Sequence, residues 1–591
     1  MNILLVGGGG REHALAWKLS QSPRLTRLYA TPGSAAIAQV AECVALDGFE
    51  AMADFALKTA IDLVVVGPET PLAAGLADLL MSRGLRVFGP LAAAARLEGS
   101  KVFSKQFMAR HGIPTAPFRT FTQVEPARDY VHELGGRCVV KADGLAAGKG
   151  AIVCRDAQEA DAALNLILVE KAFGDSGNEV VVEAFMPGEE ASYFAVCDGK
   201  DFIAFPSAQD HKPVFDLDRG PNTGGMGAYC PAPVVTPEME RKVIEEIVRP
   251  TLEGMAAEGC PFQGVLYVGL MIDKGVPRVV EYNCRFGDPE CQPQMMMLES
   301  DLVDLLEAAV EGKLAGFQPA WREGTAACIV MASGGYPGAY ETGFPIAGLE
   351  EPSPQAGCMV FHAGTARDKD RWVNTGGRVL GVTAWGETLA TALENGYRAV
   401  SGIHWQGAFF RKDIGLKGMK HDKGGRPEVN VGIVVGSASD LDVARKATEV
   451  LDKLGVRYEL AVASAHRTPE RTRAFVAACL AAGAEVFIAM AGMAAALPGV
   501  VAAETQKPVI GVPIKSSAFE GFDAMLSIAQ MPPGIPVATV AVGGGVNAAL
   551  LATGILALKY PDLEAALKEY RLEQAQKVAE AHKDAGLSTL I

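Results

Sequence analysis

The sequence lacks any pair of cysteines with the spacing of a metal or redox site. It has 11 cysteines among 591 residues, and no two of them form a Cys-x-x-Cys pair. A structural zinc site needs clustered ligands, and a disulfide framework needs densely spaced cysteines. Neither can be the basis of this fold. Scattered cysteines in apolar or helical surroundings, such as Cys138 and Cys479, are typical of reduced thiols, so we predict a cytoplasmic protein.

An excess of positive charge is also absent. Lys and Arg number 54 against 69 Asp and Glu, which gives a formal net charge of −15. Nucleic acids and anionic membrane surfaces both bind basic faces. The charge balance therefore argues against either partner, and it leaves room for a local basic pocket that binds a small phosphate.

Targeting and membrane segments are not expected. The N-terminus "MNILLVGGGG" has no charged region before its apolar run, so it does not resemble a signal peptide. Residues 486–503 and 539–558 contain no charged side chain and are long enough to be considered as membrane spans. Both are rich in Ala and Gly, and Pro498 interrupts the first. We interpret each as a buried strand, a glycine turn and a buried helix.

Composition and rhythm divide the chain into several domains, as its length predicts at roughly 100–200 residues each. A polar stretch rich in Lys and Gly, without periodicity, is typical of a linker. The predicted parts are an N-terminal α/β domain at 1–100, a second domain at 101–325, a strand-rich domain at 326–415, a linker at 416–428 and a further α/β unit at 429–591.

The fold class follows from the order of these elements. Short apolar strands alternate with helices in residues 1–100, which predicts a Rossmann-like open sheet with ligands at the carboxyl ends of its strands. The same rhythm restarts in residues 429–591 and predicts a parallel, flavodoxin-like domain. Between them, the Gly- and Pro-rich segment at 209–233 is too long for an ordinary connection, and its ordered-looking flanks favour a functional loop.

A glycine-rich loop with two lysines points to phosphate binding. The segment "VVKADGLAAGKG" (residues 139–150) lacks both the spacing and the hydroxyl of a Walker loop. Lys105, Lys141 and Lys149 could still supply charge to a phosphate. The extended run at 183–190 follows a strand and could bind the edge of an adenine through its main chain.

Glu281 and Asn283 are candidates for a metal site. They lie two residues apart in the strand-like segment "VVEYN", so both side chains share one face. A carboxylate and an amide oxygen on one face suit Mg²⁺, which keeps phosphate oxygens as further ligands. A solvated strand face would give the same pattern.

Taken together, these segments resemble the ATP-grasp ligases. The motifs "VGGGGREHALAWKL", "VVVGPETPL", "LEGSKVFSKQF", "VVKADGLAAGKG", "QDHK", "GPNTGGMGAY" and "EYNCRFGDPE" are similar to those of glycinamide ribonucleotide synthetases, over about residues 1–415. The resemblance implies two α+β lobes closing over ATP, with a lid at about 115–190 and a small α+β domain after them. It also implies that glycine forms glycyl phosphate, which the amine of 5-phosphoribosylamine then attacks.

The resemblance assigns roles residue by residue. ATP would be bound by Lys105, Lys141, Gly148, Lys149, Glu183 and Glu190. Glu281 and Asn283 would hold Mg²⁺, with Mn²⁺ as a substitute. Asp210 and Arg285 would bind the ammonium and carboxylate of glycine. Gly9, Gly10 and Glu69 would bind phosphoribosylamine.

Chemistry in the last part of the chain centres on His466. This histidine lies beside Arg467 and two residues after Ser464, an arrangement that suits a proton shuttle beside a phosphate. The loop "GSASD" (436–440) precedes a helix whose N-terminus suits a phosphate. A flavin mononucleotide site and a purely structural histidine are alternatives at this point.

Residues 429–591 resemble the aminoimidazole ribonucleotide carboxylase and mutase family through "GSASD", "SAHRTPE", "LPGVVAAET" and "DAMLSIAQMPPGIPVATVAV". The resemblance implies that Ser437, Asp440, Ser464 and Arg467 bind the ribonucleotide and that His466 moves the proton at the carbon that gains the carboxyl. It implies no cofactor, and a homo-oligomer, an octamer built through this domain.

One departure from the family pattern leaves the reaction open. The segment at 491–499 reads "AGMAAALPG", with Met493 in place of a glycine and Ala496 in place of a second histidine. Isomerisation of 5-(carboxyamino)imidazole ribonucleotide is the prediction. Direct carboxylation of aminoimidazole ribonucleotide with CO₂ and a non-catalytic assembly role are the alternatives. For the N-terminal part, the alternative is the ATP-grasp enzyme that makes 5-(carboxyamino)imidazole ribonucleotide.

Overall fold

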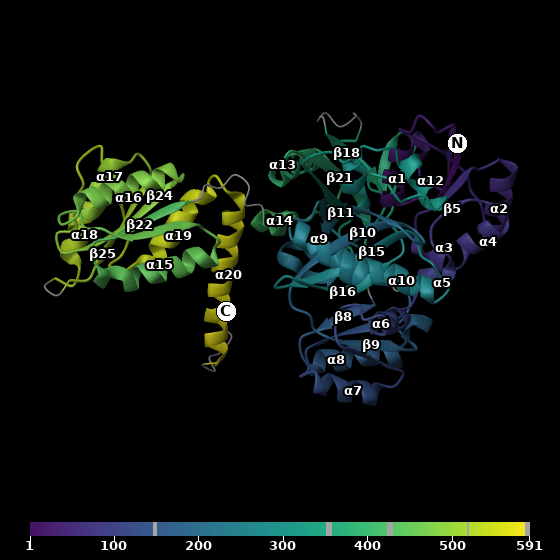
Figure 1. The fold of residues 1–591 in the computed structure, drawn as a ribbon, viewed down its shortest axis with the longest axis horizontal. Coiled ribbons are helices and arrows are strands. Elements are labelled where there is room, and N and C mark those ends of the chain that lie inside the picture. Colours follow the sequence, from purple (N-terminus) through teal and green to yellow (C-terminus); the bar gives the residue numbers. More distant parts are fainter. Residues whose placement is uncertain (146–149, 350–356, 422–428, 517–518, 585–591) are drawn as a thin grey trace. The chain divides into compact units, whose positions relative to one another are not determined.

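The computed structural model describes residues 1–145, 150–349, 357–421, 429–516 and 519–584. The chain forms two compact units, Met1–His421 and Asp422–Ile591, which we call unit 1 and unit 2 (Figure 1). Each is α/β, as the sequence predicts.

Unit 1 begins with a parallel sheet. Its strand order is β3-β2-β1-β4-β5, formed by β1 (Asn2–Gly7), β2 (Arg27–Pro32), β3 (Glu42–Cys43), β4 (Leu63–Val66) and β5 (Val87–Phe88). β4 is apolar throughout and fully buried, as is typical of a parallel strand covered on both faces. The helices of this part are α1 (Gly10–Leu19), α2 (Gly48–Lys58), α3 (Glu69–Ala73), α4 (Leu76–Ser82), α5 (Ala92–Gly99) and α6 (Lys101–Arg110).

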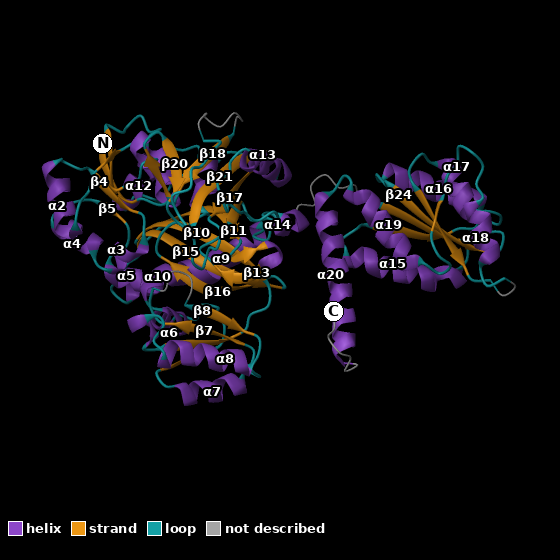
Figure 2. Ribbon diagram, turned by 180° about the vertical axis from the view of Figure 1, so that it is seen from behind, coloured by secondary structure: helices purple, strands orange, loops and turns teal. Residues whose placement is uncertain are grey.

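A four-stranded antiparallel sheet follows, which we call the lid sheet. Its order is β6 (Phe118–Phe121), β9 (Val180–Ala184), β7 (Cys138–Ala142) and β8 (Ala151–Cys154). Helices α7 (Val124–Glu133) and α8 (Ala157–Leu164) pack on one side of it and bury an apolar core (Figure 2). Side chains of β7 and β9 that do not enter this core, such as Val139 and Glu183, line a cavity.

The centre of unit 1 is one eight-stranded antiparallel sheet. Its order is β16 (Val276–Asn283), β15 (Gln263–Asp273), β10 (Glu189–Asp198), β11 (Phe202–Asp210), β14 (Gly227–Cys230), β17 (Thr325–Ala332), β21 (Arg378–Gly386) and β18 (Cys358–His362). Successive side chains of β15 enter two different cores, with Leu266 and Val268 in one and Val265 and Tyr267 in the other. The sheet is therefore covered on both faces.

Helices and two small hairpins complete unit 1. They are α9 (Pro237–Val243), α10 (Arg249–Ala257), α11 (Cys291–Met297), α12 (Leu302–Val310), α13 (Leu389–Ser401), α14 (Leu416–His421), β12 (Pro213–Phe215) with β13 (Arg219–Asn222), and β19 (Thr365–Asp368) with β20 (Arg371–Asn374). Because β14 pairs with β17, the strands β17, β21 and β18 continue the central sheet.

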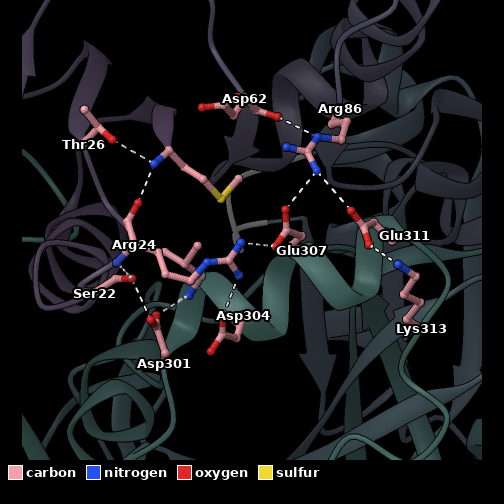
Figure 3. Close-up of polar contacts among 12 residues, drawn as sticks. Ser22, Arg24, Thr26, Asp62, Arg86, Asp301, Asp304, Glu307, Glu311 and Lys313 are labelled. Carbon is pink, nitrogen blue, oxygen red and sulfur yellow. Dashed lines mark hydrogen bonds and ion pairs between the residues drawn. The ribbon is translucent and has the colours of Figure 1, made fainter.

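The first domain is joined to α12 by a network of charges (Figure 3). The guanidinium of Arg24 lies 2.6 Å from both Asp304 and Glu307, and that of Arg86 lies 3.0 Å from Glu307 and 3.2 Å from Glu311. Each partly exposed pair contributes less than about 1 kcal/mol. Because Glu307 pairs with both arginines, the ion pairs form one connected network between the first domain and α12.

The predicted linker at 416–428 begins inside unit 1. Residues 416–421 form α14, and the rest of the linker lies outside the described residues. At Gly418 an added Cβ would lie 2.6 Å from the Tyr229 ring and 2.7 Å from Leu389. Tertiary packing against these side chains therefore overrides a composition that looks like a linker, and the expected start of the linker at residue 416 was wrong.

Unit 2 is a parallel sheet with helices on both faces. The order is β23 (Tyr458–Val462), β22 (Val431–Val435), β24 (Val486–Gly492), β25 (Val509–Ile514) and β26 (Ala538–Thr539), the flavodoxin-like arrangement. Its helices are α15 (Leu441–Lys453), α16 (Pro469–Ala481), α17 (Leu497–Glu504), α18 (Phe522–Ala529), α19 (Gly545–Ala557) and α20 (Pro561–Asp584).

The two apolar runs at 486–503 and 539–558 form parts of this unit. The first supplies β24 and most of α17, and the second supplies the end of β26 and α19. In the described part of the chain, no helix is long and apolar enough to cross a membrane.

Candidate functional site

A cavity of about 590 Å³ lies in unit 1 among the lid sheet, the central sheet and the first domain. Its lining is rich in charged groups that come from distant parts of the chain. The residues predicted from the sequence that line it are Glu69, Lys105, Lys141, Glu183, Glu190, Asp210, Glu281, Asn283 and Arg285. Gly148 and Lys149 lie outside the described residues.

Two lysines are held in the cavity by one carboxylate. Glu183, on β9, has one oxygen 3.0 Å from Lys105 Nζ and the other 2.8 Å from Lys141 Nζ. The three side chains are at most 4% exposed. Burial lowers the pKa of Lys105 to about 8, although Glu183 opposes the shift. Glu183 therefore positions two cations, and the group retains net positive charge for an anion.

Glu281 and Asn283 share one side of β16, as the two-residue spacing predicts, and both line the cavity. Burial would raise the pKa of Glu281, but Lys212, Lys141 and Lys101 lower it to about 2. The carboxylate is therefore ionised near neutral pH. Asn283 Oδ1 accepts a hydrogen bond from Arg285 Nη2 at 3.2 Å. One anionic and one neutral oxygen fit a Mg²⁺ ion that takes its other ligands from phosphate and water.

Lys212 lies between two predicted ligand-binding carboxylates. Its Nζ is 3.4 Å from Glu190 and 3.5 Å from Glu281. The pKa of Lys212 is raised well above its ordinary value, first by Glu190 and then, against the effect of burial, by Glu281. A permanent cation thus stands beside the candidate metal ligands.

Arg285 joins the first domain to the cavity. It lies 3.1 Å from Glu69 Oε2 and 2.8 Å from Glu98 Oε1. Burial lowers the pKa of Arg285, and Glu98 and Glu69 outweigh it, so the pKa is raised. The predicted substrate residue Glu69 and the predicted catalytic residue Arg285 are therefore paired with each other.

Asp210 occupies a separate acidic corner. Its carboxylate accepts the main-chain N–H of His211 at 2.6 Å. Burial and the charge of Glu290 raise the pKa of Asp210 well above its ordinary value. Glu290 in turn accepts hydrogen bonds from Tyr267, at 2.6 Å, and Ser192, at 3.3 Å. An ammonium group arriving here would favour the ionised form of Asp210.

Gly9 and Gly10 do not line the cavity but begin α1 beside it. Gly9 N–H donates to Glu12 Oε2 at 2.8 Å. A Cβ at Gly9 would be 3.9 Å from the carboxylate of Asp288, and one at Gly10 would be 3.4 Å from it. Asp288 does line the cavity. The absence of side chains at Gly9 and Gly10 therefore lets the N-terminus of α1 approach the cavity wall at Asp288. Main-chain N–H groups at a helix N-terminus suit an anion.

In unit 2, two loops at the carboxyl edge of the sheet meet. Arg467 Nη2 donates to Gly436 O at 3.3 Å, and Arg467 N–H donates to Ser464 Oγ at 3.3 Å. The predicted residues Ser437 and Asp440 lie in the first loop, and Asp440 is buried, which raises its pKa. His466 is exposed on the second loop.

The loop after β24 carries the departures from the family pattern. Met493 has a φ of 57° and is 71% exposed, and Ala495 has a φ of 39°. A backbone with positive φ is easy for glycine and unfavourable for other residues. Met493 therefore keeps a backbone conformation that explains why a glycine is usual at this position.

Comparison with known proteins decides the family. Models of phosphoribosylglycinamide synthetase match unit 1, with the N domain at 1–98, the ATP-grasp (A) domain at 99–291 and the C domain at 326–417. A phosphoribosylamine–glycine ligase of Pseudomonas aeruginosa is 52% identical over 429 residues, which cover 72% of this chain and 100% of that relative. The chain belongs to the phosphoribosylamine–glycine ligase family. A ligase of Rhizobium meliloti is 54% identical over 424 residues, which cover 71% of this chain and 100% of that relative.

Solved structures support this family for unit 1, and a second family model matches unit 2. The crystal structure of a phosphoribosylamine–glycine ligase from Thermotoga maritima has 34% identity and a TM-score of 0.62, and the match covers 70% of this chain and all of that one. A biotin carboxylase domain from Hydrogenobacter thermophilus, at 18% identity and a TM-score of 0.54 over 71% of this chain and 94% of that one, shares the fold alone. Residues 430–577 match the AIR carboxylase model. The fusion of the two families, predicted from the motifs, is confirmed.

Several charged residues of the ligase cavity were not predicted. Lys212 and Glu290 lie inside quoted motifs, "QDHK" and "GDPE", so their segments were visible but their roles were not. Lys101 donates to Gly144 O at 2.8 Å, at the start of the glycine-rich loop. Arg378, on β21, donates to the main-chain oxygen of Gly224 at 2.7 Å. No local pattern could have placed Arg378 in the cavity.

Proposed function

We propose that unit 1 ligates glycine to 5-phosphoribosylamine through glycyl phosphate. The observation that carries the proposal is that one cavity combines two buried lysines, an ionised carboxylate next to an amide oxygen, and an acidic corner. The phosphoryl step needs positioning and charge neutralisation more than covalent chemistry. ATP would supply the transferred phosphoryl group, and Glu281 and Asn283 would hold the Mg²⁺ or Mn²⁺ ion that accompanies it.

We assign one region of the cavity lining to each part of the reaction. Lys105 and Lys141 would neutralise the phosphates, with Gly148 and Lys149 of the loop as further contacts. Apolar side chains of Val139, Phe185, Met186 and Met271 would receive the adenine. Glu190 would contact the nucleoside. Asp210 would bind the glycine ammonium, and Arg285, with Glu69 and the glycines 9–10, would bind the carboxylate and the phosphoribosylamine.

The choice of acid substrate tests this function. Purified chain with ATP and Mg²⁺ should release ADP when glycine and phosphoribosylamine are both present, and it should form the glycinamide product. Bicarbonate with aminoimidazole ribonucleotide should not replace them. ADP release with bicarbonate alone as the acid would instead identify the enzyme that makes 5-(carboxyamino)imidazole ribonucleotide.

The lowered pKa of Lys105 predicts that ATP binding weakens at alkaline pH. Only its protonated form attracts phosphate, and its pKa is lowered to about 8. We therefore expect kcat/KM for ATP to be constant below that pH and to fall as pH rises through it, because kcat/KM reports groups of the free enzyme. Lys105→Met should lower kcat/KM at neutral pH and remove the alkaline limb. A wild-type profile that is flat to pH ~9.5 would contradict the assignment.

We propose further that unit 2 isomerises 5-(carboxyamino)imidazole ribonucleotide to the C4-carboxylated product. Ser437, Asp440, Ser464 and Arg467 would bind the ribonucleotide at the two loops that meet. His466 would move the proton at C4. Release and recapture of CO₂ require that the closed pocket exclude water. This step would need no cofactor. A cytoplasmic location and an octamer built through unit 2 belong to the same proposal.

Two parallel assays without ATP separate the alternatives for unit 2. One contains 5-(carboxyamino)imidazole ribonucleotide, and the other contains aminoimidazole ribonucleotide with abundant bicarbonate and CO₂. We expect rapid early formation of the C4-carboxylated product in the first only. Equal or faster formation in the second would mean direct carboxylation, associated with Ala496. No product in either would leave unit 2 as an assembly module.

A further inference from the structure

A short hairpin carries two stretches of the ligase cavity wall. β12 and β13 form a two-stranded sheet of their own. Lys212 immediately precedes β12, and residues 222–224 end β13 and follow it; all of them line the cavity. The position of this hairpin therefore determines where Lys212 stands relative to Glu190 and Glu281.

The hairpin has little of its own to hold it in place. An isolated two-stranded hairpin is marginally stable in water. Of its apolar side chains, Val214 is buried beside Met226 and Ala332, whereas Phe215 is 53% exposed and Leu217 is 45% exposed. Leu217 and Asp218 also have positive φ angles of 59° and 53°, which are unfavourable for residues with side chains. The tip, residues 216–218, therefore needs support from elsewhere in unit 1.

That support is a buried arginine near the end of unit 1. Arg411 is 1% exposed and binds Asp413 through two hydrogen bonds, from Nε at 2.8 Å and from Nη2 at 2.7 Å. Its Nη1 donates to Pro213 O at 2.9 Å and lies 3.0 Å from Asp218 Oδ1. One guanidinium thus contacts both the first strand and the tip of the hairpin.

Neighbours of Arg411 complete a clasp, which we define as residues 411–417. Asp413 Oδ2 accepts the N–H of Leu217 at 2.8 Å, and Lys412 N–H donates to Asp216 at 2.8 Å. Lys417 Nζ lies 2.5 Å from Asp218. The clasp thereby satisfies polar groups in the strained tip.

We propose that Arg411 is a positioning residue for the ligase reaction, acting through the hairpin on Lys212 and residues 222–224. The inference rests on the proposed function of unit 1. Arg411 does not itself line the cavity. Burying a guanidinium is unfavourable unless its N–H groups find hydrogen-bond and ion-pair partners. Arg411 finds some of these partners on the hairpin that carries part of the cavity wall. Reacting groups displaced by about 1 Å lose on the order of 10²-fold in rate.

The test compares Arg411→Met with Arg86→Met in the full chain. Arg86 fastens the first domain to α12 and serves as a matched control for losing an ion-paired arginine. We expect R411M to lower ligase kcat by about 10- to 100-fold, with faster amide exchange in residues 211–225. R86M should keep kcat within about twofold, as expected for an arginine in partly exposed ion pairs. Arg411→Lys keeps the charge but not the two-pronged bond, and should recover part of kcat.

Several outcomes would overturn the proposal. One is an R411M enzyme with wild-type kcat and unchanged exchange at 211–225. Another is a loss that only tracks the unfolded fraction, seen equally in R86M. If R411M does not fold, Asp218→Asn at the hairpin tip tests the proposal in its place. This variant must then show the same loss of kcat and the same faster amide exchange in residues 211–225. A wild-type chain that makes no glycinamide product would refute the proposed function instead.

Discussion

Replacing Glu281 by glutamine is expected to lower the ligase kcat/KM by about 10³-fold, in line with the loss of a preorganised electrostatic contact. Glutamine keeps the shape of the side chain and removes the negative charge. In the wild type, lysines around Glu281 hold its pKa at about 2, so the site always presents an anion. Without it, Mg²⁺ has only the neutral oxygen of Asn283 among the predicted ligands.

The measurement is glycine-dependent ADP release as a function of Mg²⁺ and Mn²⁺ concentration. E281Q should need far more metal and should not regain wild-type kcat at saturation. Glu258→Gln removes a carboxylate that pairs with Arg110 and His111 outside the cavity. This control should leave both the metal requirement and the kcat at saturating metal unchanged. Unit 2 activity in the same sample reports that the chain is intact. Wild-type metal dependence in E281Q would move the metal site elsewhere.

Replacing His466 by alanine is expected to lower C4-carboxylation by about 10²- to 10⁴-fold, the usual contribution of a positioned acid or base. The imidazole is exposed on a loop in which Arg467 donates hydrogen bonds to Ser464 Oγ and to Gly436 O. Since Ala496 stands where the family pattern has a second histidine, we expect no other imidazole of unit 2 to replace it.

His582 provides the matched control for this experiment. It is the other histidine of unit 2 and lies on α20. His582→Ala should retain full carboxylation, and ligase activity should be normal in both variants. Unchanged carboxylation in H466A would assign the proton transfer to another group. If neither variant nor wild type reacts, unit 2 serves assembly only.

Local sequence patterns predicted those features of the fold that depend only on residues close together in the chain. The apolar strands β4 and β22 are buried along their whole length, and Glu281 and Asn283 share a side of β16, because two-residue periodicity is set by the backbone itself. Two of the lysines that line the cavity, Lys105 and Lys141, were found by type and spacing. These features needed no knowledge of what lies across the sheet.

Long-range pairing was beyond sequence reasoning. Glu183 was expected to contact ATP, but its position in the chain did not indicate that its carboxylate pairs with both Lys105 and Lys141. The raised pKa of Asp210 arises from burial beside Glu290, 80 residues further along the chain. Arg378 reaches the cavity only because β21 belongs to the same sheet as β11 and β14. Each depends on strand order, which a single sequence leaves open.

The place of α14 in unit 1 has a consequence for dividing the polypeptide. This helix packs on Tyr229 through Gly418 and carries Lys417 to Asp218. A shortened ligase that stops at residue 415, where the composition first looks like a spacer, would lack both contacts. For producing unit 1 alone we therefore expect an end at His421 to keep both contacts, which places the domain boundary several residues beyond the one that composition indicates.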